Sequence, residues 1–215
     1  MTITTIDDVV SQFGRVRDQG KRPTCAAFAV SDLHASVRSK IWVPLSAEYL
    51  FYHACSRSPF FDPNSGVTLE KTLEALREEG QPEETEWPYL ERLPADLGEY
   101  KPPSIASVIY RRAGETLSSS ASEIRKQIAS RRPVIVVFTS TLQFLFAQPG
   151  SLVRNSPSDQ ALGAHAVIAV AVGEQNGQPC VKVRNSWGDK WADDGYAWVS
   201  EEYLNAQLIA LVRMV

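Results

Sequence analysis

The sequence predicts an α+β protein with a mainly helical N-terminal half, residues 1–103, and a β-rich C-terminal half, residues 104–215. In the first half, apolar residues recur at helical spacing. In the second half, runs of β-branched residues and a strong hairpin signal favour strands. Residues 81–103 contain five prolines and show no clear period, which is typical of a segment that crosses between two halves. The length of 215 residues allows one large domain or two small ones that share a cleft.

Three helices are predicted in the first half. The first begins at Cys25 and runs to about residue 38, with Thr24 as its N-cap. Ser46 is expected to cap the second helix, and Thr68 a third helix that ends before Gly80.

The second half is expected to be a series of strands with one short helix, over residues 122–131. Asn176-Gly177 is a strong hairpin signal, and it lies between runs at 167–173 and 180–184. We expect His165 to open the first strand of this hairpin, after a long loop over 139–163. The other strands are expected over residues 105–110, 133–138, 196–199 and 208–214.

Composition restricts the class of partner and the compartment. A net charge of −3 and a pI near 5.7 supply no electrostatic reason to expect nucleic acid or an anionic membrane as a partner. No apolar run is long enough to span a bilayer, and residues 1–10 lack the pattern of a secretory signal. We therefore expect a cytoplasmic protein, and delivery elsewhere by a route without a classical signal peptide stays open.

The cysteine pattern points the same way. Cys25, Cys55 and Cys180 form an odd, sparse set that agrees with a reducing compartment. Cys55 and Cys180 are interpreted as buried structural thiols. No two of the cysteines and histidines show the spacing of zinc ligands, and no metal or organic cofactor is expected.

Cys25 is the candidate nucleophile. At the first turn of a helix, unpaired backbone N–H groups and the helix dipole favour a negative charge, so a thiolate forms there at least cost. Gln19, six residues upstream, carries a primary amide that could fold back beside Cys25. Together with the backbone N–H of Cys25, this amide could donate hydrogen bonds to an oxyanion.

His165 and Asn185 are the candidate partners of Cys25. His165 lies on an apolar strand, and Asn185 follows it by twenty residues at the end of the predicted hairpin. His34 is excluded as the base, because nine residues at 100° each place it on the opposite face of the helix from Cys25. His53 has no supporting motif and is interpreted as a packed or surface histidine.

Several stretches of the chain, in order, resemble the papain-like (C1) cysteine peptidases. They are Arg17-Asp18-Gln19-Gly20, Leu45-Ser46, Trp87-Pro88-Tyr89, the strand around His165, and Asn185-Ser186-Trp187-Gly188 followed by Trp191 and Gly195-Tyr196. The resemblance implies a papain-like fold with a β-barrel-like second half and the active site in the cleft between the halves. It implies that Cys25, His165, Asn185 and Gln19 are catalytic. It also implies that Trp187 shields the bond between Asn185 and His165, and that the substrate-binding residues are Gly66, Val67, Thr68, Gly163, Ala164, Ala166 and Trp187.

The sequence departs from the family pattern around the nucleophile. Where the family has Cys-Gly-Ser-Cys-Trp, this chain has Arg22-Pro23-Thr24-Cys25-Ala26, so the disulfide-forming cysteine and the tryptophan are both missing. Ala192 stands where the family tends to have glycine. These features favour a bacterial-type member without disulfides. Only 24 residues precede Cys25, so we expect no propeptide within this chain, and a pro-segment outside it stays an alternative.

The expected function is a cysteine endopeptidase that hydrolyses peptide bonds through a thiolate–imidazolium pair and an acyl-enzyme intermediate. An acyl transferase, transpeptidase or deamidase that uses the same site remains an alternative, as does a catalytically silent relative that binds peptides or a partner protein. The expected partners are a protein or peptide substrate and a regulatory partner or parent protein that restrains activity. Nucleic acid and membranes are not expected as partners, and we expect a monomer.

Overall fold

The computed structural model describes residues 2–215, which divide into two compact units. Unit 1 contains the described residues up to Asp18 together with Glu115–Arg213, and unit 2 contains Gln19–Gly114 with Met214–Val215. This division differs from the boundary predicted at residue 103. The N-terminal segment belongs with the sheet, because strand β1 (Thr4–Asp8) pairs antiparallel with strand β5 of unit 1.

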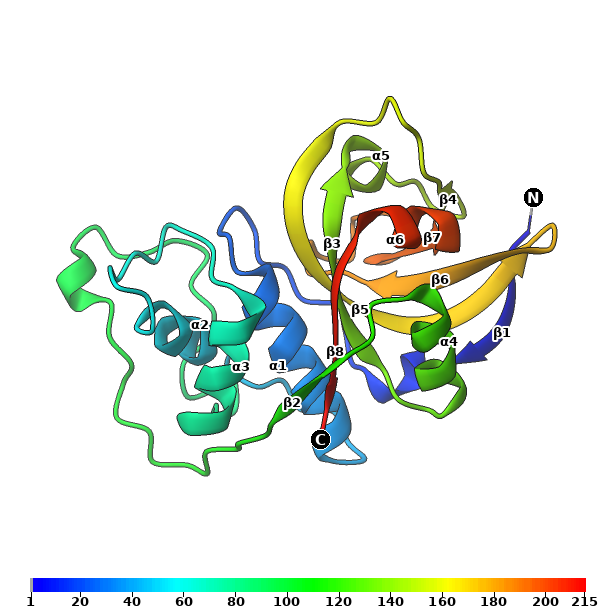
Figure 1. Ribbon diagram of the computed structural model, residues 1–215. Helices are drawn as coiled ribbons and strands as arrows, with labels where there is room; N and C mark the ends of the chain where they lie inside the picture. The colour runs from blue at the N-terminus through cyan, green and yellow to red at the C-terminus, as the bar shows by residue number, and fades with distance from the viewer. Residues whose placement is uncertain (1) are drawn as a thin grey trace. The chain divides into compact units, whose positions relative to one another are not determined.

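Unit 2 contains the three helices that the sequence predicts (Figure 1). They are α1 (Cys25–Arg38), α2 (Ala47–Cys55) and α3 (Leu69–Glu78), and a short 3-10 helix, η2 (Leu97–Glu99), follows later in the chain. Helix α1 packs against both α2 and α3. The hydroxyl of Ser46 caps α2 by accepting from the Tyr49 N–H, and that of Thr68 caps α3 by accepting from the Lys71 N–H, so both predicted caps are confirmed.

Thr24 precedes α1 as predicted, but its side chain does not cap the helix. Its backbone, at φ −107° and ψ 14°, lacks the extended conformation that places a side-chain oxygen over the first turn. The Thr24 hydroxyl instead lies 2.9 Å from the hydroxyl of Tyr89. The start of α1 is therefore tied to the proline-rich segment and not only to itself.

The strand predicted over residues 105–110 is wrong. Three of these six residues are exposed and three are half-buried, and only Tyr110 among them pairs with another segment, in an isolated bridge with Gln81. When no strand lies beside an apolar run, its backbone N–H and C=O groups bind water and form no strand-to-strand hydrogen bonds. The run therefore has no reason to adopt a β-strand.

Unit 1 is built on one eight-stranded sheet in the order β2-β8-β3-β5-β6-β7-β4, with β1 joined to β5 beside this path. The remaining strands are β2 (Gly114–Leu117), β3 (Val134–Thr141), β4 (Leu152–Val153), β5 (Ala161–Gln175), β6 (Gln178–Arg184), β7 (Tyr196–Ser200) and β8 (Leu208–Met214). The helices of this unit are η1 (Val10–Gln12), α4 (Ala121–Ala129), α5 (Leu142–Leu145) and α6 (Glu201–Gln207). Within the described chain, no pairing joins β2 to β4, so the sheet is open and does not form the expected barrel.

The predicted hairpin is confirmed as β5–β6. Asn176 and Gly177 both have positive φ, 53° and 76°, which is the two-residue turn that matches the twist of the strands. Strand β5 begins at Ala161, so His165 lies inside it, opposite Phe138 of β3, and does not open it as predicted. The predicted loop over 139–163 is shorter for the same reason: pairing with β3 extends β5 beyond its apolar run, and α5 and β4 occupy part of the remainder.

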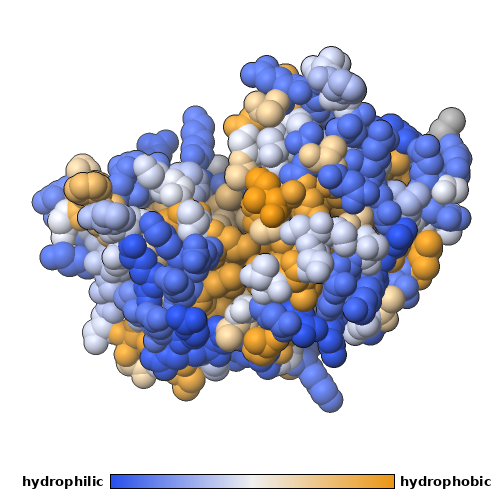
Figure 2. All heavy atoms as spheres, in the orientation of Figure 1, coloured by the Kyte–Doolittle hydropathy of each residue, from blue (hydrophilic) through white to orange (hydrophobic). Residues whose placement is uncertain are grey.

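Apolar side chains also reach the surface. Exposed examples include Ile41, Phe60 and Val108 in unit 2 and Phe146 and Ile209 in unit 1. On the face drawn in Figure 2, apolar residues gather in one area and also occur singly near the edge. No helix among residues 2–215 has both the length and the apolar character needed to cross a membrane.

Candidate active site

In unit 1, His165 and Asn185 are joined by a hydrogen bond of 2.7 Å between Nε2 and Oδ1. The β5–β6 register pairs Ile168 with Arg184, which brings the residue after β6 next to His165. Because the Asn185 carbonyl oxygen can only accept, Nε2 of His165 carries the hydrogen. This leaves Nδ1 as the ring nitrogen that can exchange a proton with a nucleophile.

Aromatic rings surround the imidazole of His165. Trp187 stacks on it, with ring centroids 4.6 Å apart and an interplanar angle of 29°, and the rings of Phe144 and Phe138 lie at 5.9 and 6.4 Å. Burial among these groups lowers the pKa of His165 to about 4, although the hydrogen bond that Nε2 donates to Asn185 opposes the shift. An imidazolium at this position therefore requires a negative charge close by.

Trp187 is itself held by its neighbours. Its ring meets Phe144 and Trp191, and the Trp191 indole N–H donates to the Leu145 carbonyl at 3.0 Å. Trp187 also pairs with Asp18 in an antiparallel bridge. The segment that leads to Gln19 is thus fastened beside the ring that covers His165.

Gly195 shows why the Asn-Ser-Trp-Gly…Gly-Tyr pattern needs a glycine. Its φ is 86°, and a Cβ atom there would lie 2.5 Å from Val16. Both the backbone conformation and the space exclude a side chain. The Gly195 carbonyl accepts from the Asn185 N–H at 3.0 Å, so this close approach also fixes the backbone of Asn185.

In unit 2, Cys25 is the first residue of the 14-residue helix α1 and is half-buried. The first turn of α1 contains no acidic residue that would compete with a thiolate. The N–H groups at the start of α1 and the helix dipole therefore favour the ionised sulfur.

Gln19 lies in the loop before α1 and is buried. The side-chain Nε2 of Gln19 donates to the backbone carbonyl of Arg22 at 2.8 Å. The backbone carbonyl of Gln19 accepts from the Tyr89 hydroxyl at 2.7 Å. Two contacts from within unit 2 thus define both the side chain and the backbone of the predicted oxyanion donor.

The predicted substrate-binding residues of unit 2 have different surroundings. Gly66 is exposed, and a Cβ atom there would meet only Pro23, at 3.6 Å or more. Val67 instead packs against the core cluster of Ala27, Phe51 and Cys55, and the Thr68 hydroxyl is used as the cap of α3. The turn therefore offers an accessible backbone at Gly66, while the next two side chains have structural contacts.

The predicted substrate-binding residues of unit 1 lie along β5, apart from Trp187. Gly163 and Ala164 are exposed, and the Gly163 carbonyl accepts from the Ser140 hydroxyl at 3.0 Å. Ala166 is buried and pairs with Val137.

Comparison with known proteins identifies the family. A family model described as "Papain family cysteine protease" matches residues 5–211. The chain belongs to the papain family of cysteine proteases. An uncharacterized peptidase C1-like protein of Acanthamoeba polyphaga mimivirus is 25% identical over 97% of this chain and 70% of its own length. The oryzain gamma chain of Oryza sativa subsp. japonica is 28% identical over 88% of this chain and 52% of its own length.

Solved structures show the same fold. Xylellain, a cysteine protease from Xylella fastidiosa, has a TM-score of 0.76 at 21% identity, covering 97% of this chain and 84% of its own. The bromelain protease from Ananas comosus, in complex with the E64 inhibitor, has a TM-score of 0.75 at 18% identity and covers 97% of each chain. The predicted α+β, papain-like fold is therefore confirmed. The chain spans about half the length of several curated relatives, 52% for the oryzain gamma chain and 55% for a cathepsin L-like proteinase of Fasciola hepatica.

In this papain-family chain, the structure brings His165, Asn185 and Trp187 together in unit 1, and it places Gln19, Cys25 and Gly66 in unit 2.

Sequence reasoning missed the role of three residues in holding the loop before Cys25. They are Arg22, Glu48 and Tyr89. One signal was visible: Glu48 is a single acid in the apolar run Ala-Glu-Tyr-Leu-Phe, and a buried acid needs a partner.

The other histidines and cysteines have structural surroundings. Nδ1 of His34 accepts from Nε2 of Gln81 at 2.8 Å, and burial lowers the pKa of His34 to about 4. Burial raises the pKa of Cys55 to about 12 and that of Cys180 to about 11, and no cysteine of the described chain is in a disulfide. Among residues 2–215, no group of three or more His, Cys, Asp and Glu side chains could hold a metal ion.

Proposed function

We propose that this chain is a cysteine endopeptidase in which Cys25 attacks the peptide carbonyl and His165 transfers the proton. The observation that carries the proposal is the hydrogen bond from His165 to Asn185 beneath the Trp187 ring, in a chain that belongs to the papain family. The chain connects the two sets of residues directly. Asp18, which pairs with Trp187, precedes Gln19, and Cys25 follows six residues later.

In the resting enzyme, Cys25 and His165 form a thiolate–imidazolium pair. Burial holds the pKa of His165 near 4 despite the hydrogen bond to Asn185, so the ring stays neutral at pH 7 unless a negative charge faces Nδ1. A thiolate at the start of α1 supplies that charge, and the helix N-terminus lowers the energy of the thiolate. Each group is therefore ionised because the other one is.

The thiolate attacks the carbonyl carbon of the scissile bond, and the carbonyl oxygen becomes an oxyanion. This oxyanion accepts hydrogen bonds from Nε2 of Gln19 and from the backbone N–H of Cys25. When the intermediate collapses, the C–N bond breaks and His165 gives its proton to the leaving amine. His165 then takes a proton from water, which attacks the thioester and restores the thiolate.

The substrate is a protein or peptide in an extended conformation. Gly66 supports this assignment, because its exposed backbone can pair with a substrate strand without interference from a side chain.

The rate at which iodoacetamide alkylates Cys25 between pH 4 and 9 tests the ion pair, with His165→Ala as the control. We expect fast labelling that persists well below pH 7 in the wild type and falls to that of an ordinary thiol in the variant. Peptide mapping separates Cys25 from Cys55 and Cys180, which burial makes slow to react. If Cys25 reacts no faster than an ordinary thiol at every pH, the proposal fails.

Product analysis separates hydrolysis from acyl transfer, because both reactions share the acyl-enzyme. We expect a mixture of peptides to yield free carboxylates at internal positions, with one oxygen taken up from ¹⁸O-labelled water. Exclusive transfer of the acyl group to an added amine would favour a transpeptidase instead.

A further inference from the structure

Beneath the loop that precedes Cys25 lies a buried ion pair between Arg22 and Glu48. The two are joined by two hydrogen bonds, Nη1 to Oε2 at 2.6 Å and Nη2 to Oε1 at 2.9 Å. Arg22 is 7% exposed and Glu48 is 0% exposed. Glu48 also accepts from the Leu90 N–H at 2.9 Å and from the Tyr100 hydroxyl. The carboxylate is thus fully supplied with donors, which is what an ion pair inside a protein needs.

Other contacts also hold the Arg22 guanidinium, although its buried Nε has no hydrogen-bond partner among residues 2–215. Nη1 of Arg22 donates to the Leu90 carbonyl at 2.6 Å, and the rings of Tyr89 and Phe51 lie 5.1 and 5.3 Å away. Burial by itself lowers the pKa of Arg22, but the hydrogen bonds and the charge of Glu48 outweigh it and raise the pKa overall. The Arg22 guanidinium therefore keeps its charge although it is buried.

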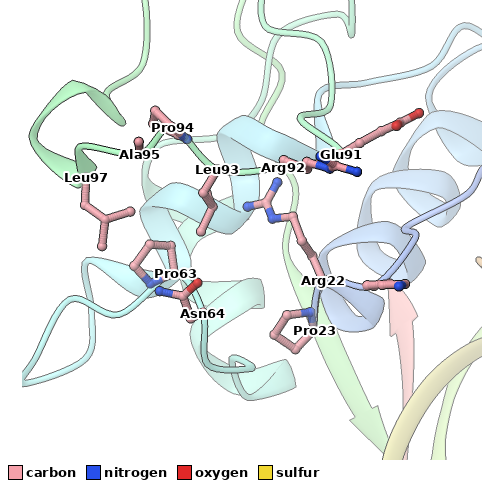
Figure 3. A pocket seen from close by; sticks show the side chains of 11 residues that line it. Arg22, Pro23, Pro63, Asn64, Glu91, Arg92, Leu93, Pro94, Ala95 and Leu97 are labelled. Atoms are coloured by element: carbon pink, nitrogen blue, oxygen red, sulfur yellow. The ribbon is translucent and has the colours of Figure 1, made fainter.

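On one side, the loop and the Arg22 side chain itself border an open cavity of about 520 Å³, whose lining also includes Lys21, Pro23, Asn64, Leu93 and Leu97. Figure 3 shows the Arg22 side chain running from the loop beside Pro23 toward Leu93 and Arg92. Because the cavity gives the loop little packing on this side, its order depends on the anchor that Arg22 provides.

The backbone of Arg22 connects this anchor to the proposed chemistry. Its carbonyl accepts two hydrogen bonds, from Nε2 of Gln19 at 2.8 Å and from the Thr24 N–H at 2.9 Å. The first hydrogen bond orients the side-chain amide of Gln19. The second fixes the backbone of Thr24, the residue before Cys25. A shift of Arg22 would therefore move both oxyanion donors.

We propose that Arg22, held by Glu48, is a positioning residue that aims the Gln19 amide at the oxyanion. The inference rests on the proposed function and names the residues that prepare its oxyanion site. Arg22 stands where the family motif has its disulfide-forming cysteine, so here an ion pair holds the loop in the place of that cysteine.

The proposed role of Arg22 predicts different effects on two reactions of the Cys25 thiolate, alkylation and peptide hydrolysis. Alkylation by iodoacetamide displaces iodide and forms no oxyanion, so it needs the pair of Cys25 and His165 but not Gln19. Peptide hydrolysis needs both. A defect confined to hydrolysis therefore reports the oxyanion site, whereas a defect in both reactions reports a damaged loop or ion pair.

The main variant is Arg22→Met combined with Glu48→Gln. It removes both charges together and leaves no unpaired ion in the core. The Gln side chain keeps one acceptor oxygen for the Leu90 N–H, and its NH2 group can donate to the Tyr100 hydroxyl. Arg22→Lys keeps the charge but loses the two-point contact and should give an intermediate effect. The matched control is Arg57→Met, because Arg57 is an arginine of the same unit that pairs with Glu78 and Glu79.

We expect the double variant to keep the wild-type pH profile of Cys25 alkylation and a similar KM, while kcat for a peptide ester falls about 10- to 100-fold. Arg57→Met should leave kcat unchanged. If the double variant folds and retains wild-type kcat, the pair is merely structural and the proposal is wrong. A wild type without reactive Cys25 contradicts the proposed function instead, and the next measurement does not depend on activity.

That measurement is the NMR signal of the Gln19 side-chain amide, assigned by its loss in Gln19→Ala. In the wild type, the bond to the Arg22 carbonyl should shift its two hydrogens apart and slow their exchange. We expect both features to disappear in the double variant and to persist in Arg57→Met. An unchanged Gln19 signal in the double variant would overturn the proposal, whatever the activity.

Discussion

In unit 1, His165 lies inside strand β5 and is surrounded by aromatic rings, whereas in unit 2 Gln19 lies in a loop and is held by polar contacts. The backbone of His165 is already fixed by pairing with β3, so its side chain needs only one hydrogen bond and a stacked ring. Gln19 has no strand on which to rely, and its support comes from Arg22 and Tyr89.

The comparison shows that the contacts needed to hold a side chain depend on whether its backbone lies in a strand or in a loop. The backbone hydrogen bonds of a sheet fix the position of a residue on a strand. For His165, packing against apolar rings is then enough to orient the imidazole. A residue in a loop has mobile neighbours, and directional contacts of a buried ion pair are needed to hold it. The two kinds of support also differ in how strongly a mutation destabilises the protein, because loss of either partner of a buried ion pair leaves an unpaired charge inside the protein.

The largest effect is expected from breaking the ion pair on one side. Glu48→Ala leaves Arg22 buried and unpaired, and the free energy of unfolding should fall by about 3–5 kcal/mol. Glu78→Ala, at an exposed partner of Arg57, should cost at most about 1 kcal/mol. Urea denaturation of both variants measures the difference, and equal losses would mean that the buried pair contributes no more than a surface one.

The next effect separates the two supported residues by their chemistry. Gln19→Ala should lower kcat/KM about 10²–10³-fold, because it removes one oxyanion donor, yet leave the alkylation of Cys25 unchanged. His165→Ala should abolish hydrolysis and lower the alkylation rate of Cys25 to that of an ordinary thiol. Parallel kinetics and iodoacetamide labelling check the distinction, which would collapse if Gln19→Ala also slowed alkylation.

A smaller effect tests the aromatic support of His165. Burial lowers the pKa of His165 to about 4, so in Cys25→Ser, which has no thiolate, the ring should titrate near that value. Trp187→Leu in the same background exposes the ring, and its pKa should rise toward the ordinary value of about 6.5. NMR titration of the His165 ring gives both numbers, and an unchanged pKa would mean that Trp187 does not keep water from the ring.

The same shift predicts how stability depends on pH in Cys25→Ser. Between about pH 6.5 and pH 4 the unfolded chain binds a proton at His165 that the folded chain does not, so stability should fall as the pH drops through this range. His34, whose pKa is also lowered to about 4, acts in the same direction. Urea midpoints at pH 7 and pH 4.5, with and without His34→Gln, measure the share of each histidine.

The smallest effect concerns a turn of unit 1. Ala192 has a φ of 47°, in the left-handed region, where the family tends to have glycine. Relief of this strain exceeds the entropy that glycine loses, so Ala192→Gly should stabilise the protein by about 0.5 kcal/mol. Ala197→Gly, within strand β7, should destabilise it by about 0.5–1 kcal/mol. Thermal unfolding of both variants measures the two changes in stability, which should have opposite signs.

The elements that local sequence controls were predictable. Helix α1 and the caps at Ser46 and Thr68 follow from residues a few positions apart, as does the turn at Asn176-Gly177. The strand expected over 105–110 failed because a strand needs a partner, and no apolar run specifies one.

The sequence by itself determined which residues could carry the chemistry, since a cysteine at a helix start and a histidine and asparagine on a hairpin are local patterns. Only the tertiary structure decided how these residues are held. The pairing of Arg22 with Glu48 spans 26 positions, and the stacking of Trp187 on His165 joins β5 to the segment after β6. Such contacts depend on where distant segments pack, and the free energy that selects them belongs to the folded chain as a whole.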